Sequence, residues 1–243
     1  SITLLLKLNN QMLNKMTNKT LYFFLAVIAA GTILVACSGP SGEKAASDDA
    51  KAVNPYGDNA IVYQANTSLS QIEWEGSKPG GKHNGTIRLK SGEIAIENGI
   101  ITGGKLVIDM NSIICLDLED QEYNQKLVGH LKSSDFFAVD SFPEAQFTIT
   151  RVAALSAPET TATGETLTHL VTGNLKMKDT EKSISFKSNI QVSEASVSAS
   201  APQFVIDRSE WKIKYGSRKF FDDLKDKFIY DEIGLKFAFT ASK

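Results

Sequence analysis

The chain has 243 residues, of which 22% are charged and 42% are hydrophobic, and its formal net charge is -2 at pH 7. These values are ordinary for a soluble globular domain. The charges are balanced and no cluster of lysines and arginines stands out, which argues against nucleic acid as a partner. Of the two cysteines, Cys37 and Cys115, the second is expected to be a buried thiol.

Residues 1–36 are interpreted as upstream residues followed by a lipoprotein signal peptide. The chain does not begin with Met, and Met12 or Met16 is the expected start of translation. Lys19 supplies a positive charge before the apolar run of residues 21–36. This run is shorter than the roughly 20 residues that a spanning helix needs, and its flanks suit a signal peptide. A retained membrane helix is the alternative interpretation.

The apolar run ends in Leu34-Val35-Ala36-Cys37, which resembles a bacterial lipobox. Signal peptidase would cleave after the small Ala36, and the thiol of Cys37 would accept diacylglycerol. Two or more acyl chains anchor a protein stably where one does not. We therefore expect a lipoprotein of the bacterial cell envelope, anchored to the membrane through acylated Cys37. The lack of Asp at position 38 favours the periplasmic side of the outer membrane over the inner membrane.

Residues 37–59 contain almost no large apolar side chains and are expected to form the lipidated Cys37 and a flexible tether. Residues 60–243 are enough for one domain with its own core. Alternating apolar residues predict about eight strands in this domain. Asn98-Gly99 is the strongest hairpin signal, Ser91-Gly92 predicts a bulge, and a second hairpin is expected to turn near Asp179-Thr180.

Within residues 129–147 a non-strand insert, which Pro143 ends, interrupts the alternation, and Ala145 and Phe147 begin the next strand. Residues 123–131 carry apolar side chains at helical spacing. Phe136, Phe137 and Phe142 then follow in one short irregular segment, and three exposed rings would be costly. The pattern predicts an apolar lid or plug at one end of a β-structure.

The C-terminal part predicts one further helix and a closing strand. Residues 217–228 carry four apolar side chains at helical spacing, with Ser217 as the candidate cap. Residues 235–239 alternate as a last strand, which could pair with the first strand and remove both edges. The expected fold is therefore all-β with minor α content: a single eight-stranded antiparallel barrel with a helix-and-loop insert and a short C-terminal helix.

The segment HLKSSDFFAVDSFPEAQFTITRV, residues 130–152, resembles the signature of the YceI-like family. Trp74 with GSKPGGKHNG, then GGKLVIDMNSI, VTGNLKMKD with ISF, and FVIDRSEWKIKYGS follow the family's other landmarks, so the resemblance spans residues 61–241. It implies a lipocalin-like barrel around an elongated apolar cavity that binds polyisoprenoids or other amphiphilic lipids. The turn at residues 178–183 departs from the family's Gly-Thr-Pro pattern, which leaves the cavity untouched.

The candidate ligand-binding residues are apolar side chains of the predicted strands and lid. For each residue alone, ordinary core packing explains the pattern better, because small barrels are often filled by side chains. Only the whole set, together with the resemblance, favours a cavity. The set consists of Trp74, Ile87, Leu89, Ile108, Met110, Phe136, Phe137, Phe142, Phe147, Leu175, Met177, Phe186, Phe204, Phe237 and Phe239.

Four polar or aromatic residues have two interpretations, structural or facing a lipid head group. Arg208, near Trp211, could pair with a carboxylate or lie on an aromatic ring, or it could meet the head group at the cavity mouth. His83 and His130 lack metal-ligand spacing, so no metal site is expected, and His130 is expected to anchor the lid by hydrogen bonding.

Three functions remain open from the sequence. No Gly-x-Ser-x-Gly, P-loop or Cys-x-x-Cys motif and no catalytic residue is found, which favours a lipid-binding or carrier lipoprotein over an enzyme. The alternatives are a hydrolase or isomerase acting on a lipid in the same cavity, and a structural envelope-stress protein with a filled barrel. No cofactor is expected to be required, a bound isoprenoid or fatty-acid-like lipid is the expected ligand, and the oligomeric state is left open.

Overall fold

The computed structural model describes residues 39–243. The predicted signal peptide and the predicted lipid attachment at Cys37 lie outside the described residues. Among the helices of residues 39–243, none is long and apolar enough to cross a membrane.

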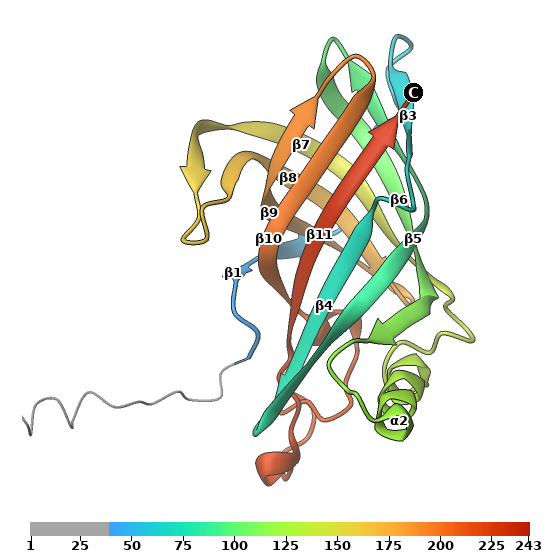
Figure 1. Cartoon of the computed structure of the whole chain (residues 1–243), viewed down its shortest axis with the longest axis vertical. Coiled ribbons are helices and arrows are strands. Elements are labelled where there is room, and N and C mark those ends of the chain that lie inside the picture. Colours follow the sequence, from blue (N-terminus) through green and yellow to red (C-terminus); the bar gives the residue numbers. More distant parts are fainter. Residues whose placement is uncertain (1–38) are drawn as a thin grey trace, which may run out of the picture. The chain divides into compact units, whose positions relative to one another are not determined.

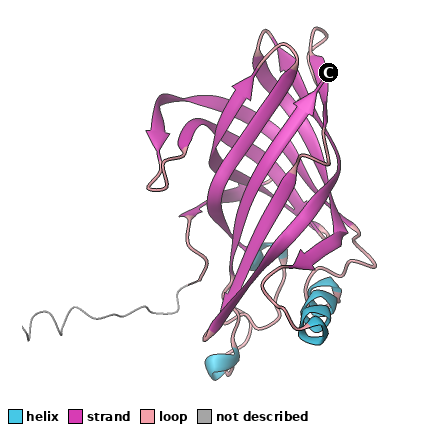
Figure 2. Ribbon diagram, in the orientation of Figure 1, coloured by secondary structure: helices cyan, strands magenta, loops and turns pink. Residues whose placement is uncertain are grey.

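Strands dominate the described part of the chain and belong to one sheet (Figures 1 and 2). They are β1 (Glu43–Lys44), β2 (Ala46–Asp49), β3 (Ile61–Ala65), β4 (Gln71–Lys78), β5 (Gly81–Glu97), β6 (Ile100–Cys115), β7 (Glu144–Thr160), β8 (Thr166–Met177), β9 (Thr180–Val192), β10 (Ser196–Asp207) and β11 (Glu232–Ser242). The helical elements are the α-helix α2 (Gln121–Lys132) and two 3₁₀ turns, η1 (Arg208–Trp211) and η2 (Lys225–Lys227).

The sheet closes on itself as a ring of eight strand positions. β3 and β4 share one position, because both pair with β11 on one side and β5 on the other. From β5 the ring runs through β6, β7, β8 and β9 to β10, which pairs with β9 and β11. The predicted eight-stranded antiparallel barrel is confirmed, and the C-terminal strand closes it against the first ones, as expected.

Local sequence signals set the hairpin between β5 and β6. Asn98 (φ 53°) and Gly99 (φ 78°) both adopt the left-handed conformation that a tight two-residue turn requires. The pairing of β5 with β6 shifts register between Leu89 and Ser91, where the sequence predicts a bulge. The second hairpin turns one residue earlier than predicted, at Lys178 (φ 54°) and Asp179.

Gly85 allows β4, β5 and β6 to approach closely. A Cβ atom at this position would stand 1.8 Å from the carbonyl oxygen of Ile114 and 2.8 Å from ring atom Cε2 of Trp74. The indole Nε1 of Trp74 donates to the same Ile114 oxygen at 3.2 Å. Backbone and indole thus occupy the space that any side chain at position 85 would need.

Replacing Gly85 with alanine is expected to lower the free energy of unfolding by roughly 1–3 kcal/mol, because strand backbone must shift to admit the methyl group. Gly76→Ala on the neighbouring β4 is the matched control, since no atom lies within 4 Å of a Cβ there. Chemical denaturation of both variants measures the difference. Equal unfolding midpoints would show that β5 and β6 can separate without cost.

The insert between β6 and β7 consists of α2 and a series of turns, as the sequence predicts. The side chain of Asp120 caps the helix by accepting hydrogen bonds from the N–H groups of Glu122 (2.9 Å) and Tyr123 (3.1 Å). The turns bury Phe136 and Val139 and return the chain to the sheet. In Figure 1, α2 lies at one end of the barrel, which we call the helix end.

Residues 39–51, which we name the N-terminal strap, are not the structureless tether that the sequence predicts. β9 and β10 pair with each other only through residues 189–192 and 197–200. The strap runs between the remaining parts of these strands: β1 pairs with Phe204 and Val205, and β2 pairs with residues 182–185. The prediction of a flexible tether is therefore wrong for residues 43–49.

Backbone and side-chain hydrogen bonds explain how a strap with few apolar side chains is held. The N–H of Ala45 donates to Val205 at 2.8 Å, and the Ala45 side chain is buried. The buried amide of Asn174 accepts from the N–H of Lys51 at 2.9 Å and donates to its carbonyl oxygen at 2.7 Å. Polar groups of the backbone, which carry no hydrophobic signature, thus order the segment.

The predicted helix over residues 217–228 is absent, and only the single 3₁₀ turn η2 lies there. The Ser217 hydroxyl donates to Asp231 at 2.9 Å, so this side chain holds a loop against the barrel and does not cap a helix. Phe220 and Phe221 are 42% and 49% exposed, whereas Phe228 is buried under the guanidinium of Arg218. Tertiary contacts of the loop therefore outweigh the helical spacing.

Candidate functional site

The barrel encloses an elongated cavity with a volume of about 470 Å³. Its lining extends from Ile101 and Val197, near the ends of the β5–β6 and β9–β10 hairpins, to His83 and Lys227 at the helix end. Small-molecule sites commonly have volumes of about 300–1,000 Å³ and mostly apolar walls. The interior is therefore not completely filled by side chains, which weighs against the filled-barrel alternative.

The structure brings nearly all predicted wall and lid residues to this cavity. The lining includes Trp74, Ile87, Leu89, Ile108, Met110, Phe136, Phe137, Phe147, Leu175, Met177, Phe186, Phe204, Phe237 and Phe239. Phe142 is the exception among the predicted set, because it does not line the cavity. Its N–H donates to Ala138 (φ 47°) at 2.9 Å, in the turn that leads the chain out of the lid and into β7.

Four phenylalanines from different strands form one aromatic group in the wall. The rings of Phe186 on β9 and Phe204 on β10 stack with centroids 4.4 Å apart. Phe147 on β7 and Phe237 on β11 lie 5.7 and 5.5 Å from Phe186. A wall of this kind offers dispersion contacts to an apolar chain and few groups that require hydrogen bonds.

Further lining residues were not singled out from the sequence. Ile184 and Leu235 alternate in phase with Phe186 and Phe237, so the same strand periodicity could have found them. Ile94 lies five residues after Leu89 and lines the cavity beyond the register shift between Leu89 and Ser91. Ser188 and Tyr215 carried no such signal. The buried hydroxyl of Ser188 donates to the carbonyl oxygen of Ser200 at 2.8 Å, which satisfies this polar group beside an apolar wall.

An aromatic cluster joins the lid to the loop after β10. The ring of His130 on α2 lies 4.9 Å from Phe136 and 4.6 Å from Tyr215, edge to face in both cases. His130 Nε2 lies 3.1 Å from the Asp135 carboxylate. His130 therefore makes the hydrogen bond to the insert that the sequence predicts, and it also contacts the cavity.

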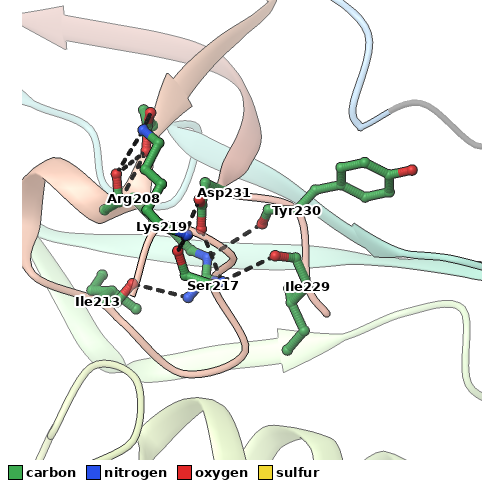
Figure 3. Close-up of polar contacts among 9 residues, drawn as sticks. Arg208, Ile213, Ser217, Lys219, Ile229, Tyr230 and Asp231 are labelled. Atoms are coloured by element: carbon green, nitrogen blue, oxygen red, sulfur yellow. Dashed lines mark hydrogen bonds and ion pairs between the residues drawn. The ribbon is translucent and has the colours of Figure 1, made fainter. Parts of the chain in front are cut away.

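Arg208 makes several polar contacts beneath the lid. Its guanidinium donates to the carbonyl oxygens of Tyr230 (3.2 Å), Ile213 (2.9 Å) and Ile229 (3.3 Å), as Figure 3 shows. It also lies 3.2 Å from the Asp231 carboxylate.

Arg208 lines the cavity, and its surroundings also give it a structural role. The side chain is almost fully buried, and burial lowers the pKa of the guanidinium although nearby carboxylates, Asp231 first, oppose this. The guanidinium carbon lies 5.7 Å from the ring centroid of Phe136, so Arg208 also supports the lid from below. Both interactions expected from the sequence, with a carboxylate and with an aromatic ring, are present.

Trp211 has a structural position as well. Its side chain is fully buried, and its indole Nε1 donates to the carbonyl oxygen of Leu175 at 2.9 Å. Trp211 does not line the cavity. This hydrogen bond fastens η1 to β8.

A second ion pair ties the loop to the end of β10. Asp207 is buried and pairs with the half-exposed Lys219, and it accepts a hydrogen bond from the N–H of Ser209 at 3.0 Å. Burial opposes ionisation of Asp207, but the hydrogen bonds from Lys219 and Ser209 outweigh it and lower the pKa of this carboxyl. The hydrogen bond to Asp207 raises the pKa of Lys219.

This pair predicts that part of the stability is lost in acid. A lowered carboxyl pKa contributes stability that is full above the unfolded value of about 3.9 and disappears as pH falls through the folded value. Lys219→Met should therefore destabilise the protein at pH 7 and by progressively less below about pH 4. Urea unfolding from pH 7 to pH 2 measures this, with the exposed Lys105→Met as control. A Lys219→Met effect that is constant over this range would contradict the assignment.

Cys115 is buried, as predicted, and it is a free thiol. Burial raises the pKa of this thiol, which lies 3.2 Å from Asp117 Oδ1. His83, which lines the cavity, places its Nδ1 2.9 Å from Asp117 Oδ2. Among the described residues that line the cavity, the only carboxylate is Glu232.

The structure is of the class of closed antiparallel β-barrels with a lidded apolar cavity. Comparison with known proteins gives the family. A family model described as YceI-like domain matches residues 63–241. The chain belongs to the YceI-like family. A comparison with curated proteins found no match.

Solved structures share the fold at low sequence identity. Burkholderia cenocepacia BcnA is 18% identical, with a TM-score of 0.54 over 73% of this chain and 99% of that chain. A Saccharophagus degradans protein, described as a polyisoprenoid binding domain implicated in plant cell wall breakdown, is 14% identical. Its TM-score is 0.50 over 74% of this chain and 97% of that chain. At these identities the likeness establishes the barrel and not the ligand.

Proposed function

We propose that the protein binds or carries a polyisoprenoid or another amphiphilic lipid inside the barrel. The apolar lining of the cavity carries this proposal, because it offers an alkyl or prenyl chain a continuous hydrophobic surface. The Saccharophagus degradans domain of the same fold, described as polyisoprenoid binding, supports the ligand class.

Burial of an apolar chain in this cavity provides enough free energy for binding without a catalytic group or a cofactor. Each buried methylene contributes about 0.8 kcal/mol, so ten methylenes contribute about 8 kcal/mol, which corresponds to micromolar affinity before ordering costs. Glu232 is the only carboxylate among the described lining residues, which supports binding over lipid hydrolysis or isomerisation. We infer a binding protein that needs no cofactor to fold or to hold its ligand.

The decisive experiment identifies what the protein holds. The barrel should be purified without detergent, extracted with organic solvent and analysed by mass spectrometry for prenyl or acyl chains. A stoichiometric amphiphile is expected. If no lipid is recovered and no fluorescent fatty or prenyl probe binds the purified protein, the filled-barrel alternative becomes the better explanation.

We further propose that the protein is exported and anchored in the cell envelope by acylation of Cys37. The lipobox-like Leu34-Val35-Ala36-Cys37 supports this proposal. Cells fed radioactive palmitate should label the wild-type chain, whereas Cys37→Ala should lose the label and leave the membrane fraction. An unlabelled wild-type chain would rule out the anchor while leaving lipid binding by the barrel unaffected.

A further inference from the structure

Three potential metal ligands meet at the helix end of the barrel, on the hairpin of β5 and β6. They are His83 near the start of β5, Cys115 at the end of β6, and Asp117 two residues later; we name them the rim cluster. Their ligand atoms all lie within 4.8 Å of one another. The Asp117 carboxylate stands between the other two, 2.9 Å from His83 Nδ1 and 3.2 Å from Cys115 Sγ.

Hydrogen bonds to and from the backbone hold the three residues in place. The N–H of Leu116 donates to the carbonyl oxygen of Asn84, and the N–H of Asn84 donates to Asp117 Oδ1, both at 2.9 Å. On the other side, the Asn124 amide on α2 donates to the carbonyl oxygens of Cys115 and Leu118, each at 3.0 Å. The cluster is thus preorganised, and it is linked directly to the lid helix.

The donor set matches the chemistry of zinc-class ions. An imidazole nitrogen, a thiolate and a carboxylate bind Zn²⁺ at about 2.0–2.3 Å, and three protein ligands leave a fourth tetrahedral position open. Neighbouring donors then stand about 3–4 Å apart. The 2.9 and 3.2 Å separations are close to this spacing, and rotation of side chains can bring sulfur and imidazole nearer to each other.

The solvent exposure and the protonation chemistry of the three ligand side chains agree with such a site. The side chains of His83 and Asp117 are 29% and 30% exposed, so an ion can enter from solvent, whereas Cys115 is buried behind them. Coordination replaces the proton of the Cys115 thiol with the ion, and this proton passes to solvent. His83 binds as neutral imidazole, with Nδ1 as the donor atom that already faces the cluster.

We propose that the rim cluster binds one divalent transition-metal ion of the zinc class. The ion would bridge β5 to the segment between β6 and α2, so it would fix the attachment of the lid. This proposal goes beyond lipid binding and does not depend on it, because no lipid atom is needed to form the metal site. The ion is an accessory to the barrel and not a requirement for its folding.

Cobalt and zinc titrations of the chelator-treated protein test the site directly. Co²⁺ should bind at one ion per chain and give a near-ultraviolet sulfur-to-metal charge-transfer band, which Zn²⁺ then removes by displacement. Cys115→Ser should lose the band, and His83→Gln and Asp117→Asn should each weaken Co²⁺ binding at least about tenfold. His169→Gln is the matched control, since His169 lies outside the cluster, and it should bind as the wild type does.

Two results would overturn the proposal. One is the absence of stoichiometric Co²⁺ and Zn²⁺ binding to the folded wild-type protein. The other is Co²⁺ binding by His83→Gln and Asp117→Asn that equals binding by the wild type. Both of these substitutions are at partly exposed positions, so they test the proposal even if Cys115→Ser does not fold. Zn²⁺ should also raise the thermal midpoint of the wild type and not that of Asp117→Asn, a readout that needs no lipid.

Discussion

Ile108→Lys is expected to abolish binding of a fluorescent fatty or prenyl probe while the barrel stays folded. Ile108 lines the cavity from β6, and a lysine there would place an ammonium group against the bound chain. Burying an unpaired charge costs several kcal/mol, so the dissociation constant should rise at least about 1,000-fold. Probe titration gives the affinity, and the thermal midpoint reports whether the variant is folded.

The neighbouring residue provides the matched control for this experiment. Val107 precedes Ile108 on β6 and is not part of the cavity lining, so Val107→Lys introduces the same side chain on the opposite face of the strand. It should bind the probe as the wild type does. If both lysine variants are folded and bind equally well, the cavity is not where the probe binds.

Arg208→Met is expected to cost about 3–5 kcal/mol of unfolding free energy, the largest loss of stability from any single substitution considered. The substitution keeps an apolar stem but removes every hydrogen bond from the guanidinium to Ile213, Ile229 and Tyr230. It also leaves the Asp231 carboxylate, whose side chain is 10% exposed, without its cationic partner. Chemical denaturation measures the loss.

Two further variants separate the reasons for that loss. Arg208→Lys keeps the charge but cannot reproduce the planar set of donors, so it should recover only part of the stability. The double variant Arg208→Met with Asp231→Asn removes the unpaired carboxylate and should be more stable than Arg208→Met alone. A single variant Arg208→Met with wild-type stability would show that the network in Figure 3 contributes nothing.

Strand periodicity and turn chemistry account for what the sequence predicts correctly. Alternation places Ile108 and Met110 on the inner face, and Asn98-Gly99 accepts positive φ, so both the wall and the register follow from local rules. The prediction of a helix at residues 217–228 is wrong because long-range contacts, and not local rules, determine the structure there. The spacing of the apolar side chains is helical, but Ser217 and Lys219 bind Asp231 and Asp207, partners that no local pattern reveals.

The rim cluster was also beyond reach of sequence reasoning. His83 is separated from Cys115 and Asp117 by most of β5 and β6, and none of the three stands at a metal-ligand spacing. Only the pairing of Gly85 with Cys115 across the hairpin brings them together. Pairings between distant segments, which depend on register, thus determine both this site and the lid contacts.

The N-terminal strap affects whether neighbouring copies of the barrel can associate through their strand edges. Because β1 and β2 occupy the gap between β9 and β10, a chain that began at residue 60, the boundary the sequence suggests, would leave residues 182–185 and 204–205 with unpaired backbone groups. Two such open edges are templates for strands of neighbouring molecules. The strap therefore acts as the barrel's own protection against edge-to-edge aggregation.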